Sequence, residues 1–85
     1  MSYTVTLKRE ADKEFSLLPK NYYKLVKRHL LELKEEPHPH GSIKLKGSEN
    51  TFRLRVGVYR IIYEVHNNEL IVLIISISHR KDAYR

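Results

Sequence analysis

The chain has 85 residues, of which 41% are hydrophobic and 31% are charged. These values exclude a disordered or fibrous protein and predict one small domain, residues 1–85, with a single hydrophobic core. Sixteen Lys and Arg residues against ten Asp and Glu residues give a formal net charge of +6. A positive field on so small a surface attracts polyanions, most often nucleic acid, although a basic surface without such a partner has the same composition.

The sequence has no cysteine, so it can form neither a disulfide nor a thiolate zinc site, and a reducing, cytoplasmic environment is expected. The first residues lack the basic and apolar segments of a signal peptide. The longest apolar run, residues 70–75, is far shorter than the ~20 residues that cross a bilayer. We therefore expect a soluble protein with no membrane partner.

The first half of the chain predicts a short strand and two amphipathic helices. Residues 3–7 alternate between polar types and β-branched or aromatic types, as strands do. Residues 8–18 carry apolar side chains at helical spacing, and Pro19 ends that helix. A second helix follows a short Pro-Lys-Asn link and must end before Pro37, because proline disfavours helical geometry in the residue before it. The resulting helical hairpin needs a sheet to cover its apolar stripe.

Residues 37–42 form a loop by composition, and this loop contains His38 and His40. A metal site needs three or four convergent ligands with supporting groups, and no cysteine or carboxylate cluster accompanies these two histidines. We therefore expect neither a metal ion nor another cofactor.

Three strands are predicted in the second half. Residues 51–56 alternate between apolar and polar types, and Gly57 allows a tight turn into residues 59–65. Asn67 and Asn68 suit a second hairpin turn because asparagine tolerates positive φ. Residues 70–78 are almost unbroken in apolar types, as in a central strand covered on both faces. The predicted fold class is α+β, with the N-terminal strand and the helical hairpin packed on one face of a small antiparallel β-sheet and the other face left for function.

A two-residue turn at Gly57 would place Arg55 directly opposite Arg60, with Arg53 on the same face. Like charges directly opposite across strands cost up to about 1 kcal/mol, which favours a bound anion over a merely solvated face. The planar donors of arginine match phosphate oxygens, but its permanent charge makes it a poor proton carrier. The segment after the last strand would add charge and titratable groups to the edge of this face: His79, Arg80, Lys81, Tyr84 and Arg85.

The motifs of other phosphate chemistry are missing from the sequence. Carboxylates in the sheet half are few, with Glu64 and Asp82 the main candidates, which disfavours a two-metal phosphodiesterase centre. There is no glycine-rich phosphate loop, no nucleophile elbow and no carboxylate pair placed for glycoside chemistry. The sequence is therefore compatible with a reaction on phosphate that needs no metal ion.

Three segments carry a resemblance to a known family: residues 43–47 (IKLKG), 52–65 (FRLRVGVYRIIYEV) and 77–84 (ISHRKDAY). In combination with the helical hairpin, they resemble the RelE/ParE superfamily of bacterial and archaeal toxins from toxin–antitoxin pairs. The resemblance covers essentially the whole chain. It implies a RelE-like fold and, for the RelE branch, ribosome-dependent cleavage of messenger RNA by the ribose 2′-hydroxyl without a metal.

The same resemblance implies roles for individual residues. Arg60 would stabilise the charge that develops on the phosphate, Arg80 would serve the phosphate or the leaving group, and Tyr84 would handle the 2′-hydroxyl proton. His79 is the alternative proton carrier because imidazole titrates near neutrality, and its other interpretation is a strand-end histidine bonded to backbone. The residues expected to bind RNA are Lys44, Lys46, Arg53, Arg55, Lys81 and Arg85.

Arg53 and Arg55 stand where the best-known RelE pattern has lysines. Arginine does not deprotonate, so these positions keep their electrostatic role and cannot transfer a proton.

The partners implied are a cognate antitoxin, the ribosome and messenger RNA, with a toxin–antitoxin hetero-oligomer as the assembly. Two alternatives belong to another class of function: a ParE-like inhibitor of DNA gyrase, or a family member that lost catalysis and only binds its antitoxin. The joint presence of Arg60, Arg80 and Tyr84 favours the nuclease.

Overall fold

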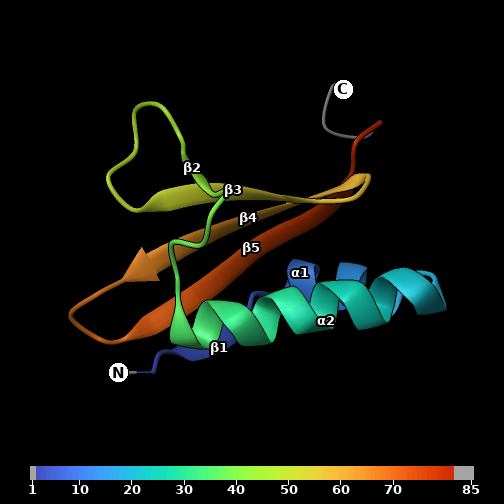
Figure 1. The fold of residues 1–85 in the computed structure, drawn as a ribbon, viewed down its shortest axis with the longest axis horizontal. Helices are drawn as coiled ribbons and strands as arrows, with labels where there is room; N and C mark the ends of the chain where they lie inside the picture. Colours follow the sequence, from blue (N-terminus) through green and yellow to red (C-terminus); the bar gives the residue numbers. More distant parts are fainter. Residues whose placement is uncertain (1, 82–85) are drawn as a thin grey trace.

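The computed structural model describes residues 2–81, which form two layers, a helical hairpin and a twisted five-stranded sheet (Figure 1). In chain order the elements are β1 (Thr4–Leu7), α1 (Arg9–Ser16), α2 (Lys20–Glu35), β2 (Ile43–Lys44), β3 (Thr51–Val56), β4 (Tyr59–His66) and β5 (Ile71–His79). The strand order is β1-β5-β4-β3-β2, and both helices lie on one face of the sheet. The predicted α+β class is confirmed. No helix within residues 2–81 is both long and apolar enough to cross a membrane.

The sheet is mixed, whereas an antiparallel sheet was expected. β1 pairs with β5 in parallel, from Thr4 opposite Ile71 to Leu7 opposite Ile74. Parallel neighbours need a crossover connection, and the chain between β1 and β5 supplies one because it runs through both helices. The alternation of residues 3–7 indicates a strand but contains no information about the direction of its partner.

The link between the helices has the expected three residues but lies two residues earlier in the chain than expected. Pro19 is the N-terminal cap of α2, so the connection consists of residues 17–19 and Lys20 already belongs to the helix. Proline suits a helix start because its missing N–H would have no intrahelical partner there. α2 ends at Glu35, two residues before Pro37, as the sequence predicts.

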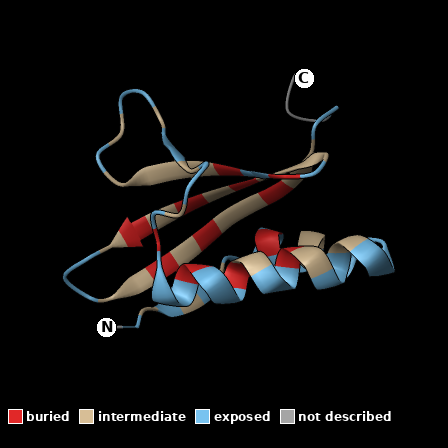
Figure 2. Cartoon of the chain, in the orientation of Figure 1, coloured by how far each residue is buried: buried red, intermediate tan, exposed pale blue. Residues whose placement is uncertain are grey.

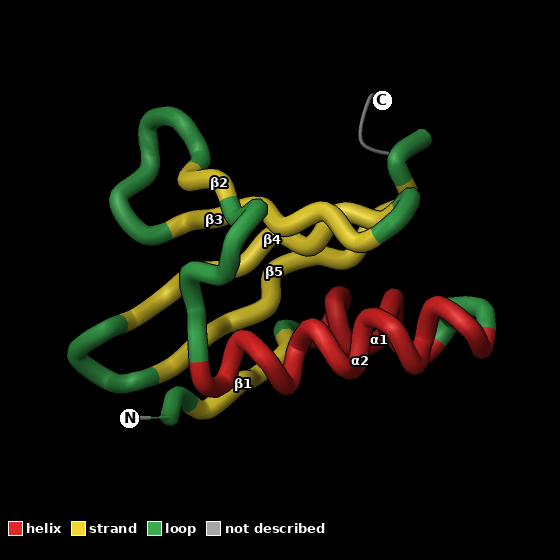
Figure 3. Tube along the Cα trace, viewed as in Figure 1, coloured by secondary structure: helices red, strands yellow, loops and turns green. Residues whose placement is uncertain are grey.

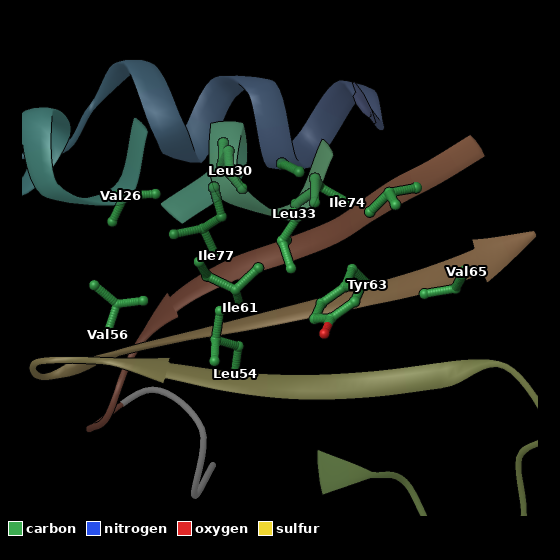
Figure 4. Close-up of a cluster of buried hydrophobic side chains, with 12 residues drawn as sticks. Val26, Leu30, Leu33, Leu54, Val56, Ile61, Tyr63, Val65, Ile74 and Ile77 are labelled. Atoms are coloured by element: carbon green, nitrogen blue, oxygen red, sulfur yellow. The ribbon is translucent and has the colours of Figure 1, made fainter. Parts of the chain in front are cut away.

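The core lies between the helices and one face of β3, β4 and β5 (Figures 2 and 4). On α2, Val26, Leu30 and Leu33 recur at spacings of four and three, so they form one buried stripe. The strands contribute alternating residues to the same core: Leu54, Val56, Ile61, Tyr63, Val65, Val72, Ile74 and Ile77. Burial of each such side chain stabilises the fold by about 1.5–3 kcal/mol.

β5 is buried on one face only, because both helices lie on the same side of the sheet. Val72 and Ile74 are fully buried, whereas Ile71 and Leu73 are partly exposed on the other face. The expectation that this strand is covered on both faces is therefore wrong. The apolar residues on the face of β5 without helices, such as Ile71 and Leu73, are therefore only partly buried, and within residues 2–81 no second layer of helices covers them.

A β-bulge in β5 changes which residues face the helices. Ile62 pairs with Ser76, but Tyr63 pairs with Ile74, so Ile75 has no partner residue on β4. The extra residue shifts the alternation by one position. Beyond the bulge, Ile77 and His79 share the helix side with the core, and Ser76 and Ser78 lie on the open face.

The turn between β4 and β5 also differs from the expected one. It occupies residues 67–70, and the residue with positive φ is Leu70, at 55°, rather than either asparagine. Asn67 has another role, because its side-chain oxygen accepts a hydrogen bond of 2.7 Å from the Tyr3 hydroxyl. The turn is thereby tied to the residue just before β1.

Tyr63 ties the loop after α2 to the core. Its hydroxyl donates a 2.8 Å hydrogen bond to the carbonyl of Pro37 from a fully buried position. Burial raises the pKa of Tyr63 above its usual value of 10.0, a side-chain hydrogen bond with Ser42 lowers it, and the charge of Glu36 adds to the rise. The loop also packs through His38, whose ring lies 4.7 Å from the ring of Phe52 in an edge-on contact.

This arrangement predicts how stability depends on alkaline pH. A group with a raised folded-state pKa stabilises the fold fully below its unfolded pKa, near 10 for a phenol, and that stabilisation is lost as pH rises through the folded value. Tyr63→Phe should therefore make the alkaline loss of stability shallower. At pH 7 it should lower the free energy of unfolding by about 1 kcal/mol, because the hydrogen bond to Pro37 is gone. Urea unfolding between pH 7 and 11 measures both effects, with Tyr23→Phe as the control, since that ring is partly exposed. Identical curves for the two variants would contradict the prediction.

Candidate nucleic-acid interface

The β3–β4 turn determines the geometry of the candidate site. Val56 pairs with Tyr59, which leaves Gly57 and Val58 as a two-residue loop. Gly57 has a φ of 60° and Val58 has no positive φ, the pattern of a type II′ turn, whose twist matches that of paired strands. The predicted two-residue turn is confirmed.

The turn brings arginines from the two strands together. Arg55 lies directly opposite Arg60, and Arg53 lies opposite Ile62 on the same face. Directly opposed residues have Cβ atoms only about 4.5–5.5 Å apart. Since Leu54 and Val56 point into the core, these arginines lie on the face without helices.

Arg80 joins this group from the end of β5. Its backbone N–H donates a 2.7 Å hydrogen bond to the carbonyl of Val58, at the tip of the turn. A shallow depression at this end of the sheet is lined by Arg55, Gly57, Val58, Tyr59, Arg60 and Arg80. Figures 1 and 3 show the end of β5 leaving the sheet beside this turn, on the side away from the helices. Strands β3 and β4 and the residue directly after β5 therefore supply arginines to one small surface, which we call the arginine face: Arg53, Arg55, Arg60 and Arg80.

Among residues 2–81, the strand carboxylate on this face is Glu64, which lies at its other end. Glu64 is opposite Thr51 and is held by His66, whose Nε2 lies 2.9 Å from the Glu64 Oε1. Within residues 2–81, Arg53 and Arg55 form no ion pair with a carboxylate. Arg55 lies opposite a like charge, and its guanidinium and that of Arg53 match an anion with several oxygen acceptors. A phosphodiester has this chemistry.

His79 lies on the opposite side of the sheet from the arginines. It pairs with Tyr59, and the two rings meet edge-on with centroids 5.3 Å apart. His79 lines a separate hollow beside the helical hairpin, with Glu14, Leu17, Leu18, Tyr59, Ile77 and Ser78. The structure thus brings Arg55, Arg60 and Arg80 together and does not bring His79 to them.

The remaining predicted RNA-binding residues are spread around the sheet. Lys44 is exposed on the edge strand β2 and pairs with Phe52, so it belongs to the face opposite that of Arg53. Lys46 is exposed in the turn after β2, and Lys81 is exposed after β5. Tyr84 and Arg85 lie outside the residues that the structure describes.

The structure adds residues that the sequence did not point to. Ser78 lies opposite Arg60 and Ser76 opposite Ile62, so two hydroxyls border the arginine face. Glu14 of α1 accepts a 2.9 Å hydrogen bond from the backbone N–H of Ile77, where β5 extends beyond β1 and has no strand partner on that side. The bulge in β5 turns the two serines toward this face, and its position depends on the pairing with β4. Over residues 2–81, no three His, Asp or Glu side chains converge as metal ligands would.

A family model described as "ParE toxin of type II toxin-antitoxin system, parDE" matches residues 2–84. A putative toxin RelE1 of Methanocaldococcus jannaschii is 32% identical, and the match covers 100% of this chain and 98% of that protein. The chain therefore belongs to the RelE/ParE family of toxins from type II toxin–antitoxin systems.

Other relatives agree with this assignment. The mRNA interferase toxin RelE of Escherichia coli K12 is 29% identical over 95% of this chain and 86% of its own length. The RelE chain in the archaeal RelE–RelB complex from Pyrococcus horikoshii superposes with a TM-score of 0.84 at 30% identity, covering 94% of this chain and 97% of that one. The predicted RelE-like fold is confirmed.

The geometry of the arginine face predicts how RNA binding depends on salt. Arg55→Gln should weaken binding of a single-stranded oligoribonucleotide and reduce the slope of log K against log salt by about 0.7, the value for one phosphate contact. The same substitution should leave the melting temperature unchanged or raise it, because the repulsion with Arg60 is relieved. Fluorescence anisotropy over a salt series and thermal unfolding measure the two effects. Arg28→Gln, on an exposed position of α2, is the matched control, and equal slopes for both variants would argue against the arginine face as the binding surface.

Proposed function

We propose that this toxin is a metal-independent endoribonuclease that cleaves messenger RNA on the ribosome. The observation that carries the proposal is the convergence of Arg55, Arg60 and Arg80 on one depression beside the β3–β4 turn. The name of the Escherichia coli relative, an mRNA interferase, supports the same reaction.

The chemistry follows from the groups available. The ribose 2′-oxygen attacks the adjacent phosphorus, the bond from phosphorus to the 5′-oxygen breaks, and the products are a 2′,3′-cyclic phosphate and a free 5′-hydroxyl. Negative charge builds on the phosphate oxygens during this step, and preorganised guanidinium donors stabilise it without any movement of solvent. Arg60 and Arg80 take this role, and Arg53 and Arg55 hold the neighbouring phosphates.

Two proton transfers accompany the reaction. Tyr84 accepts the 2′-hydroxyl proton in this proposal; its neighbours in the sequence, Lys81 and Arg85, are basic, and positive charge beside a phenol favours the phenolate form. The 5′-oxygen takes a proton from water as it leaves, on the Arg80 side of the site. Tyr84 lies outside the described residues, so its role rests on the resemblance of residues 77–84 to the family.

The position of the cut and the chemical ends of the fragments test whether the residues of the arginine face, with Tyr84, catalyse the cleavage. Wild-type protein added to a translating extract should give toe-print stops within codons and fragments ending in 2′,3′-cyclic phosphate. Arg60→Ala, Arg80→Ala and Tyr84→Phe should each lower the cleavage rate by 100-fold or more, about 2.7 kcal/mol of transition-state stabilisation. Arg28→Ala should cleave like wild type. Cleavage of naked RNA at the same sites, or full activity of Tyr84→Phe, would refute the mechanism.

We further propose that one toxin domain, residues 1–85, acts in the cytoplasm and is neutralised by a cognate antitoxin. The Pyrococcus horikoshii relative is seen in a complex with RelB, which supports such a partner. An acidic or amphipathic antitoxin segment would neutralise the charge of the arginine face and exclude RNA.

Induced expression of the wild type should stop growth, and co-expression of the antitoxin, sought in the adjacent reading frame, should restore it. Copurification on a tag should give a hetero-oligomer that no longer cleaves RNA. If no neighbouring reading frame restores growth, the proposed pairing with an antitoxin is contradicted.

A second candidate function is inhibition of DNA gyrase, because the description of the matching family model names a ParE toxin. A supercoiling assay with purified gyrase separates the two. Loss of supercoiling together with intact messenger RNA would replace the proposed function by this one.

A further inference from the structure

Three rings from three different elements meet at the arginine end of the sheet, on the side of the helices. Tyr59 of β4 contacts Tyr22 of α2 with centroids 4.8 Å apart and an angle of 64°. Its other neighbour is His79 of β5, at 5.3 Å and 81°. Both contacts are edge-to-face, the geometry that aromatic quadrupoles favour. We call this group the aromatic column.

The column is pressed against the turn that sets the arginine register. A Cβ atom placed on Gly57 would lie 3.0 Å from the Cε1 of Tyr22, closer than side chains normally approach. The Tyr22 ring therefore fills the space under Gly57, and only glycine fits there with a φ of 60°. A helix residue thus supports both the turn and the first residue of β4.

The last ring of the column is also tied to the arginine end of β5. The Nδ1 atom of His79 accepts a 3.1 Å hydrogen bond from the backbone N–H of Lys81. Between them, the N–H of Arg80 is bonded to Val58 at the turn. Residues 79–81 are therefore fixed at both ends, and the side chain of Arg80 leaves the backbone from between these two bonds.

The same hydrogen bond bears on what His79 can do. A neutral imidazole has one N–H and one acceptor nitrogen, so a ring whose Nδ1 accepts carries its proton on Nε2. Neither nitrogen then has a free lone pair for a substrate proton. The ring also lies on the helix side, across the sheet from the arginine face.

We infer that Tyr22, Tyr59 and His79 form a positioning column that fixes Arg80 relative to Arg60, with His79 acting through this packing and not as a proton carrier. The inference rests on the proposed function for its activity readout. Tyr59 and Arg60 are neighbours on β4, and Arg80 directly follows His79, the last residue of β5, so the contact on one face sets the spacing of the arginines on the other. A misplacement of about 1 Å in such a site can cost 100-fold in rate.

The substitutions at His79 separate the two roles, because neither replacement can transfer a proton. His79→Phe keeps a ring against Tyr59, whereas His79→Asn keeps an acceptor for the Lys81 N–H without the ring. His79→Phe should rescue cleavage to within about threefold of wild type with an unchanged pH profile, and His79→Asn should lower kcat by about 10- to 100-fold with KM nearly unchanged. Equal loss in both variants, or a pH-rate limb that disappears in His79→Phe, would overturn the inference.

A substitution at Tyr22 tests the column from the helical layer, where no contact with RNA is proposed. Tyr22→Leu should lower kcat by about 10-fold, and Tyr22→Phe should restore it. Tyr23→Leu is the matched control, since Tyr23 stacks on Phe15 at 4.4 Å and has no ring contact with the column. It should lose similar stability and keep its activity. Equal activity in Tyr22→Leu and Tyr23→Leu at matched melting temperature would overturn the inference.

A readout without cleavage keeps the inference separate from the proposed function. In ¹H–¹⁵N spectra of the arginine Nε groups, Tyr22→Leu should shift the Arg60 and Arg80 signals, and Tyr23→Leu should leave them in place. If the wild type cleaves no RNA, the proposed function is wrong, but this measurement still tests whether the aromatic column positions Arg60 and Arg80. Unmoved Arg60 and Arg80 signals in Tyr22→Leu would refute it.

Discussion

Gly57 has a φ of 60° and no side chain, and these two properties allow β3 to turn into β4 within two residues while Tyr22 packs beneath. The register of the whole hairpin follows from this turn, because Val56 must then pair with Tyr59 and Arg55 with Arg60. The carbonyl of Val58 also anchors the N–H of Arg80. One short turn therefore determines which charged side chains share a face and how the end of β5 reaches them.

The placement of arginines opposite each other works against stability. The opposed pair of Arg55 and Arg60 costs up to about 1 kcal/mol, and a small domain has only about 5–15 kcal/mol of net stability in total. The core offsets this with a continuous apolar layer between α2 and three strands. The helices cover one face of the sheet, and the arginines lie on the other face. An anion on that face, whether a phosphodiester or an acidic segment of another protein, removes the repulsion.

The sequence was most informative where local chemistry decides the structure. Alternation along residues 51–56 and the glycine after them were enough to predict the arginine register, because a side-chain period of two and a two-residue turn leave one pairing. Helix periodicity and Pro37 likewise gave the end of α2. These features depend on neighbours in the chain.

Other features depend on distant contacts, and the sequence did not reveal them. The bulge at Ile75 depends on the pairing of β5 with β4, and it places Ile77 and His79 on the helix side and Ser76 and Ser78 on the open face. The parallel pairing of β1 and the contact of Tyr22 with Tyr59 join segments far apart in the chain. Periodicity in either segment alone gives no information about the other. Tyr84 and Arg85 stay predictions.

The central claim is that phosphate binds where Arg55, Arg60 and Arg80 converge. The most direct measurement is an NMR titration with a short RNA whose 2′-oxygens are methylated, so that it binds and is not cleaved. The Nε signals of these three arginines should shift together and saturate at the same RNA concentration, while Arg28 on α2 should not respond. Shifts centred on the helical hairpin, with the arginine face unmoved, would contradict the central claim.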